Sequence, residues 1–211
     1  MEIDIYADVV CPWCWIGRRR LEQALASYDG KVTVRHRPFQ LDPSPVTEPR
    51  PLLDALGDKF GGAERARQMA AQVTEVGASV GLDLHFERAI AANTFDAHRL
   101  INWAAERGRG GETVEALHRV HFTDGVDIGA PDALAAVAAD VGLDGDEARR
   151  FLDSDAGVAE LTAELSAARQ LGVTSVPTFV LAGKYAVTGA QEPATLLAAL
   201  AEVADRESTG A

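Results

Sequence analysis

The two cysteines of the chain, Cys11 and Cys14, are separated only by Pro12 and Trp13. A structural disulfide that closes so short a loop would add little stability, because the entropic gain grows with the number of residues enclosed. The C-x-x-C spacing is typical of a redox dithiol or of half a zinc site. Zinc needs about two further ligands, and the chain has no second cysteine pair. We therefore expect redox chemistry and no metal, with a zinc site or a pair of core cysteines as the alternatives.

The cysteines lie where a strand is expected to give way to a helix. Residues 2–8 alternate with period two, which predicts a strand, and Pro12 is favoured at the first position of a helix. Free N–H groups and the positive end of the helix dipole stabilise a thiolate at that place. We therefore expect Cys11 to be the nucleophile. Cys14, one turn further in and less exposed, is expected to be the resolving thiol.

The two ends of the chain predict an α/β framework around the dithiol. A second strand is expected over residues 31–37, and the helix between the two strands favours a parallel pair with a right-handed crossover. Near the C-terminus, a strand over 173–182 is expected to turn at Gly183 and pair with residues 185–188 as a hairpin. A final amphipathic helix is expected over 192–205.

The middle of the chain has a different pattern. Four prolines between Gln40 and Pro51 are too many for a helix or a central strand, so we expect a loop there. Beyond it the sequence is Ala-rich with helical periodicity, and the one alternative is a short strand over 82–86. Helices are expected over residues 63–79, 95–106, 112–122, 132–141 and 146–152. The sequence thus predicts a discontinuous α/β domain, residues 1–50 and 155–211, with an all-helical insertion over 51–154.

Composition and charge exclude several classes of function. The chain of 211 residues has 20 Lys and Arg against 32 Asp and Glu, a net charge of −12. A protein that binds nucleic acid or an anionic membrane needs a basic face. With 47% hydrophobic and 25% charged residues, the composition matches a soluble globular protein without a membrane span. The N-terminus is acidic and alternating, unlike a secretory signal. We therefore expect a cytoplasmic protein without nucleic-acid or membrane partners; the oligomeric state is not predicted.

Five motifs, spread over nearly the whole chain, form an ordered set. They are DVVCPWCWIG at 8–17, FQLDP at 39–43, NTFDAHRL at 93–100, FTDG at 122–125 and GVTSVPTF at 172–179. This set resembles the DsbA-like branch of the thioredoxin superfamily, and more closely its cytoplasmic FrnE-type members. The resemblance implies a thioredoxin-like fold and an enzyme, a dithiol-disulfide oxidoreductase or isomerase. Its redox group would be its own dithiol, with no separate cofactor and with glutathione as a candidate co-substrate.

The resemblance also implies further site residues. It implies that Pro177 is cis and packs against the dithiol, and that Val176 offers its backbone to an extended substrate. A proline directly before an apolar strand is itself compatible with a cis bond in a tight turn. We expect Pro12, Trp13 and His98 to contact the substrate, a polypeptide or a small thiol or disulfide. The alternative for His98 is a core histidine on the apolar side of its helix.

One position departs from the pattern of the superfamily. Many thioredoxin-like proteins bury a carboxylate six residues before the first cysteine, where it shuttles the proton of the resolving thiol. Here that position is Ile5. Asp8 is the nearest alternative for proton handling. Its other interpretation is that of a turn or cap former at the end of the strand.

Two other functions remain as alternatives. Kappa-type glutathione transferases and hydroxychromene-carboxylate isomerases form a sister branch of the same fold, bind glutathione, and typically carry serine where Cys11 stands here. The presence of both Cys11 and Cys14 argues against that branch. The third interpretation is a non-enzymatic redox-sensing module whose dithiol changes its binding surface.

Overall fold

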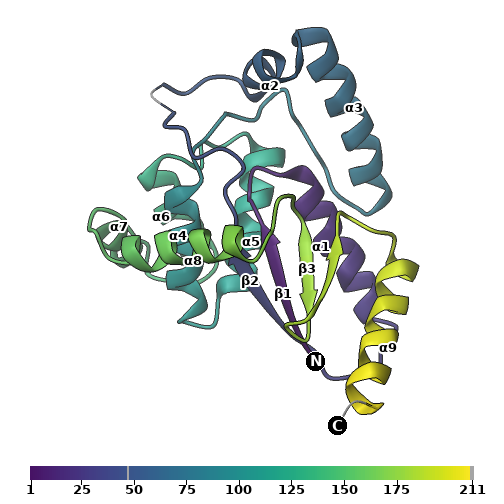
Figure 1. Ribbon diagram of the computed structural model, residues 1–211. Coiled ribbons are helices and arrows are strands. Elements are labelled where there is room, and N and C mark those ends of the chain that lie inside the picture. The colour runs from purple at the N-terminus through teal and green to yellow at the C-terminus, as the bar shows by residue number, and fades with distance from the viewer. Residues whose placement is uncertain (47, 210–211) are drawn as a thin grey trace. The chain divides into compact units, whose positions relative to one another are not determined.

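The computed structural model describes residues 1–46 and 48–209. The chain forms two compact units (Figure 1). The first unit consists of Met1–Phe39 and Glu164–Ala211, and the second of Gln40–Ala163. The first division, after Phe39, lies before the boundary expected near residue 50, and the second, before Glu164, lies after the boundary expected near residue 155.

The first unit is a four-stranded mixed sheet with helices. Its elements are β1 (Glu2–Ala7), α1 (Pro12–Leu25), β2 (Thr33–Pro38), β3 (Thr178–Leu181), β4 (Tyr185–Thr188) and α9 (Pro193–Thr209), and α8 (Val158–Gln170) ends in it. The strand order is β2-β1-β3-β4. β1 pairs with β2 in parallel and with β3 in antiparallel fashion, and β3 and β4 form the predicted hairpin. The parallel β1–α1–β2 arrangement predicted from the sequence is confirmed.

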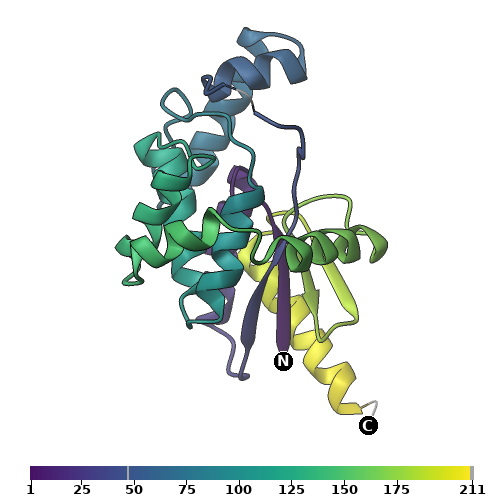
Figure 2. The same cartoon turned by 90° about the vertical axis from the view of Figure 1, so that its left-hand side faces the viewer.

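A hydrophobic core holds α1 and α9 against one face of this sheet (Figures 1 and 2). The period-two pattern of β1 directs Ile3 and Ile5 to that face. The core consists of Ile3, Ile5, Leu21, Ala24, Phe179, Leu181, Leu196, Leu200 and Val203. Because α1 is packed along its length, its N-terminus is fixed at the end of β1, where the dithiol lies.

The second unit is helical in the part that the structure describes. Its elements are α2 (Leu52–Phe60), α3 (Ala63–Ser79), α4 (Phe95–Ala105), α5 (Gly110–Arg119), the π-helix η1 (Val120–Asp124), α6 (Pro131–Asp140), α7 (Gly145–Leu152) and the start of α8. The strand considered over residues 82–86 is wrong, because Leu82, Leu84 and Phe86 are buried without a partner strand. No described helix, in either unit, is both long and apolar enough to cross a membrane.

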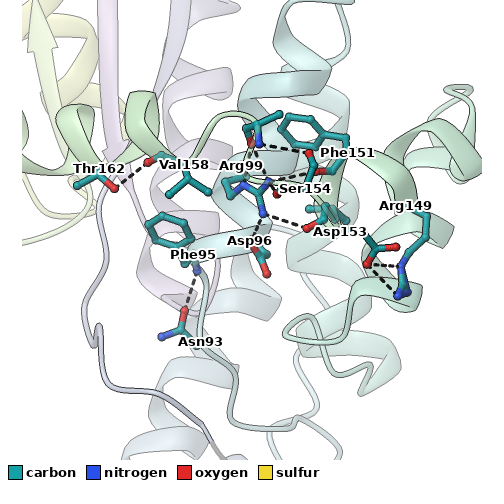
Figure 3. A network of polar contacts seen from close by, with 12 residues as sticks. Asn93, Phe95, Asp96, Arg99, Arg149, Phe151, Asp153, Ser154, Val158 and Thr162 are labelled. Atoms are coloured by element: carbon teal, nitrogen blue, oxygen red, sulfur yellow. Dashed lines mark hydrogen bonds and ion pairs between the residues drawn. The ribbon is translucent and has the colours of Figure 1, made fainter.

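The proline-rich segment belongs to the second unit through contacts that its composition did not predict. The Gln40 side chain donates to Asn93 Oδ1 at 3.0 Å, and the Asn93 amide donates to the Ser44 carbonyl at 2.9 Å. Pro51 forms an isolated antiparallel bridge with Ile90. Asn93 Oδ1 also accepts from the backbone N–H of Phe95 at 2.9 Å, at the start of α4 (Figure 3). This explains why the unit begins at Gln40.

A buried arginine ties α4 to the end of α7 (Figure 3). The guanidinium of Arg99 forms an ion pair with Asp96 at 2.7 Å, and its side chain is 4% exposed. It also donates to backbone carbonyls of Phe151, Leu152, Ser154 and Ala156, at 2.6 to 3.2 Å. The last carbonyls of a helix lack partners within it. Arg99 therefore satisfies the C-terminal end of α7 and the loop that follows.

Candidate dithiol site

The dithiol occupies the strand–turn–helix junction that the sequence predicts. Cys11 is the N-cap of α1, in an extended conformation, and Pro12 is the first helical residue. The N–H of Cys11 donates to the Asp8 carbonyl at 3.1 Å, and the N–H of Cys14 donates to the Cys11 carbonyl at 3.0 Å. This turn places Cys11 at the positive end of the dipole of α1. Both cysteines are free thiols.

The two thiols differ in their surroundings. Burial raises the pKa of Cys14 well above its usual range; the side chain is 2% exposed. A hydrogen bond with the Cys11 side chain and the negative charges of Cys11 and Asp8 raise this pKa further, while a hydrogen bond with the Asp8 backbone lowers it. These surroundings favour the protonated form of the Cys14 thiol.

The Val176–Pro177 turn completes the site within the first unit. The peptide bond between these residues is cis, as expected from the sequence. The Cys11 sulfur lies 3.9 Å from the Val176 carbonyl oxygen. Val176 is partly exposed and Pro177 is buried. The structure thus brings together the dithiol and the turn that the resemblance to DsbA-like proteins implied.

Gly17 is a site residue that the sequence reasoning missed. A Cβ atom at Gly17 would lie 2.8 Å from Pro177 Cγ and 3.3 Å from Phe179 Cζ, distances that require the neighbouring atoms to move. Glycine is unfavourable inside a helix, and Gly17 lies inside α1, about one turn after the dithiol. A glycine at a helical position was the signal from which the sequence could have indicated close packing here. The missing side chain allows α1 to approach Pro177 closely.

Gly17→Ala is therefore expected to destabilise the protein, although alanine is the better helix former. We expect a loss of about 1 to 3 kcal/mol in the free energy of unfolding, typical of overpacking, measured by urea denaturation. Gly77→Ala in α3 is the matched control, because its added Cβ would meet the end of the flexible Leu84 side chain. A Gly17→Ala variant at least as stable as the wild type would contradict the close packing of α1 and Pro177.

The other expected site residues lie in different surroundings. Trp13 is 39% exposed beside the buried thiols, and Pro12 is partly buried at the start of α1. Asp8 is fully buried at the end of β1. His98 is buried on α4 in the helical unit, so its contact with substrate stays a prediction. Among residues 1–46 and 48–209, no group of three or more His, Cys, Asp or Glu side chains gathers as a metal ion would require.

His36 is a titratable group of β2 that faces α1. Burial lowers the pKa of His36 to about 4, the positive charge of Arg18 lowers it further, and the negative charge of Glu22 opposes this. Arg18 and Glu22 are themselves ion-paired at 2.9 Å. His36 is therefore neutral in the folded protein at neutral pH.

The low pKa of His36 predicts a specific loss of stability in acid. Unfolding returns the pKa to about 6.5, so protons bind the unfolded chain preferentially between pH 6.5 and about 4. The contribution of His36 to the free energy of unfolding is fully present above pH 6.5. It is lost as the pH falls towards 4, by roughly 1 kcal/mol per pH unit. The free energy of unfolding, measured by urea titration at several pH values, should fall more steeply with decreasing pH for the wild type than for His36→Gln across this window. Identical pH dependences would contradict the low pKa assigned to His36.

Comparison with known proteins decides the family. A family model described as a DSBA-like thioredoxin domain matches residues 2–201. The chain belongs to this family. The DSBA-like chain is similar to a probable DsbA oxidoreductase from Streptomyces coelicolor, with a TM-score of 0.90 and 36% identity over 96% of this chain and 89% of that one. The thioredoxin-like fold with helical content that the resemblance implied is confirmed.

Two further proteins are similar to this chain over most of its length. The uncharacterized protein YwbO of Bacillus subtilis (strain 168) is 28% identical over 192 residues, 90% of each chain. The structure of a 2-hydroxychromene-2-carboxylate isomerase is similar to this DSBA-like chain with a TM-score of 0.70 and 18% identity, over 100% of each chain. The isomerase shares the fold. The fold therefore does not choose between the oxidoreductase and the isomerase, and the residues of the site must do so.

Proposed function

We propose that this DSBA-like protein is a thiol-disulfide oxidoreductase in which Cys11 attacks and Cys14 resolves. The observation that carries the proposal is the asymmetry of the dithiol. Both thiols are buried, but Cys11 is the N-cap of α1, whereas Cys14 lies inside the helix and has a pKa raised by burial and by a hydrogen bond with the Cys11 side chain. A nucleophile stabilised as thiolate beside a protonated second thiol is what a two-step exchange needs.

The exchange proceeds through a mixed disulfide. The Cys11 thiolate attacks one sulfur of the substrate disulfide; a bond forms between them, and the other substrate sulfur leaves as a thiolate that takes a proton from solvent. Cys14 then loses its proton and attacks the Cys11 sulfur, which releases the second substrate thiol. The substrate gains two electrons and the dithiol becomes a disulfide. A thiol such as glutathione would reduce it again, and the reverse sequence would oxidise a substrate dithiol.

The surroundings of Cys11 support a polypeptide or a small peptide disulfide as substrate. Val176 is partly exposed and its carbonyl oxygen lies 3.9 Å from the Cys11 sulfur, so an extended segment could pair with the backbone at this place. Trp13, which lies between the two cysteines in the chain, is 39% exposed and offers an apolar surface. The FrnE-type resemblance supports a cytoplasmic setting, in which glutathione would be the reducing thiol.

Competitive alkylation tests the asymmetry. With limiting iodoacetamide at neutral pH, we expect Cys11 to be labelled at least about tenfold faster than Cys14, because the thiolate is the reactive species. Peptide mapping by mass spectrometry identifies the labelled cysteine, and labelling of the unfolded chain in urea is the control for intrinsic reactivity. Equal labelling in the folded protein, or faster labelling of Cys14, would overturn the assignment of roles.

An isomerase or glutathione transferase is the second candidate, favoured by the structural likeness to the isomerase. In those enzymes the thiolate of glutathione itself reacts, so the Cys14 thiol would be dispensable. Assays of insulin reduction, scrambled-disulfide repair and glutathione conjugation on the wild type and on a Cys11→Ser, Cys14→Ser double variant separate the two. We expect all disulfide activities to vanish in the double variant.

A further inference from the structure

The loop between β4 and α9, residues 189–192, contacts the turn that lies beside the dithiol. The N–H of Gly189 donates to the Pro177 carbonyl at 2.7 Å. Because proline has no N–H, this carbonyl is the one backbone group through which Pro177 can be held. The Val176 carbonyl oxygen, one residue earlier, lies 3.9 Å from the Cys11 sulfur. A shift of the loop would therefore move the turn relative to the attacking thiol.

Arg20 binds this loop from the side of α1. It is the last of three consecutive arginines, and its side chain is 11% exposed. Nη1 donates to the Ala190 carbonyl at 2.5 Å, and Nη2 forms an ion pair with Glu192 at 2.7 Å. Nε is buried and has no hydrogen-bond partner in the part of the chain that the structure describes. The guanidinium is therefore oriented by its contacts with the loop, which must offset the cost of the buried Nε.

Arg20 shares its face of α1 with Gly17, because residues three apart are neighbours on the surface of a helix. A Cβ atom at Gly17 would lie 2.8 Å from Pro177 Cγ and 3.5 Å from Ala190 Cα. This face of α1 thus contacts both the turn and the loop. Gly17 allows the close approach because it lacks a side chain, and Arg20 maintains it through two polar contacts.

We propose that Arg20 is a positioning residue: it holds the 189–192 loop against α1 and thereby keeps the Val176–Pro177 turn beside the Cys11 sulfur. This inference rests on the proposed oxidoreductase function. An extended peptide that pairs with the backbone of Val176 needs the turn in this place, whereas a small aliphatic disulfide needs the Cys11 thiol alone. Arg20 therefore favours peptide disulfides over small ones. The bonds made and broken in the exchange are unchanged.

Arg20→Met tests this role through the ratio of two rate constants measured on one protein. The reduced protein is mixed, in separate reactions, with a peptide disulfide and with hydroxyethyl disulfide. Acid quenching and mass spectrometry follow oxidation of the dithiol. We expect the second-order rate constant for the peptide to fall by about tenfold, because a misplaced turn no longer aligns the substrate, and that for hydroxyethyl disulfide to stay unchanged. Loss of folded protein would lower both rate constants equally and leave their ratio unchanged.

Arg19→Met is the matched control for Arg20→Met. Arg19 is on the same helix and forms an ion pair with Glu22 within α1 at 2.8 Å. Its variant should keep the wild-type ratio of the two rate constants. An unchanged ratio in Arg20→Met, or an equal fall in Arg19→Met, with a wild type that reduces both disulfides, would overturn the Arg20 proposal alone. A wild type that reduces neither disulfide would overturn both proposals.

Glu192→Ala is the second variant, because it removes the ion pair from the side of the loop. The Glu192 side chain is 68% exposed, so its removal should leave the fold intact. We expect the ratio to fall in the same direction as in Arg20→Met but by less, because the contact with the Ala190 carbonyl remains. If Arg20→Met does not fold, the ratio in Glu192→Ala decides: a fall supports the proposal, and the wild-type ratio overturns it.

Discussion

Cys14→Ser is expected to stop the protein as a covalent mixed disulfide, and Cys11→Ser is expected to prevent attack altogether. The first variant keeps the thiol at the N-terminus of α1 but lacks the buried thiol that releases the substrate. The second keeps only a thiol that is buried and has a raised pKa. Incubation with oxidised glutathione followed by intact mass spectrometry should show one adduct for Cys14→Ser and none for Cys11→Ser.

The double variant is the control for this experiment, because it lacks both thiols and serine is close to cysteine in size. Thiol-disulfide exchange should be undetectable in it. If glutathione conjugation or isomerase turnover survives in the double variant, and Cys14→Ser traps no adduct, then the isomerase-like alternative would replace the proposed function. An adduct on Cys11→Ser would reverse the assigned order of the two thiols.

Among the substitutions considered for stability, Arg99→Met is expected to cause the largest loss in the free energy of unfolding. Methionine keeps the aliphatic length but removes every donor that serves Asp96 and the carbonyls after α7. It also removes the stacking of the guanidinium over the Phe151 ring, 5.0 Å from its centroid. The Asp96 side chain is 36% exposed and can be hydrated, whereas a buried carbonyl that loses its donor costs about 1 to 3 kcal/mol, so we expect a total loss of about 3 kcal/mol. Urea denaturation, followed by circular dichroism, measures the change.

Arg149→Met is the matched control for Arg99→Met. Arg149 lies on α7 and forms an ion pair with Asp153 (Figure 3) and another with Asp132. Its side chain is 35% exposed, and exposed ion pairs contribute about 1 kcal/mol or less. The two arginines should therefore differ severalfold in their effect on the free energy of unfolding. Equal losses in the free energy of unfolding would contradict the stabilising role assigned to the buried contacts of Arg99.

Local signals were sufficient to predict the centre of the site. The alternation before Cys11 and the proline at the first helical position predicted the junction, and both are read from adjacent residues. For Pro177 the local sequence was only compatible with a cis bond, and the resemblance to DsbA-like proteins implied both the cis bond and its place beside the dithiol. The hairpin after Pro177 was predicted with the observed residues for β4, because a glycine-containing turn separates two apolar runs.

Contacts between distant segments could not be predicted from the sequence. The helix α2 follows a proline-rich segment and was missed, and the helix expected over 112–122 ends at Arg119, where the π-helix η1 begins. The close approach of Gly17 to Pro177 joins residues that lie far apart in the chain. Likewise, no local pattern distinguishes a turn-forming aspartate from Asp8, whose complete burial depends on the packing around it. Tertiary packing decides these features.

The most direct test of the central claim is to follow one turnover of the wild-type protein. The reduced dithiol is mixed with one equivalent of a peptide disulfide, quenched in acid at successive times and mapped by mass spectrometry. We expect the peptide to appear first on Cys11 and then to leave, with a disulfide between Cys11 and Cys14 as the final state. A peptide attached first to Cys14, or a substrate that is consumed while the two cysteines remain reduced and unmodified throughout, would contradict the account.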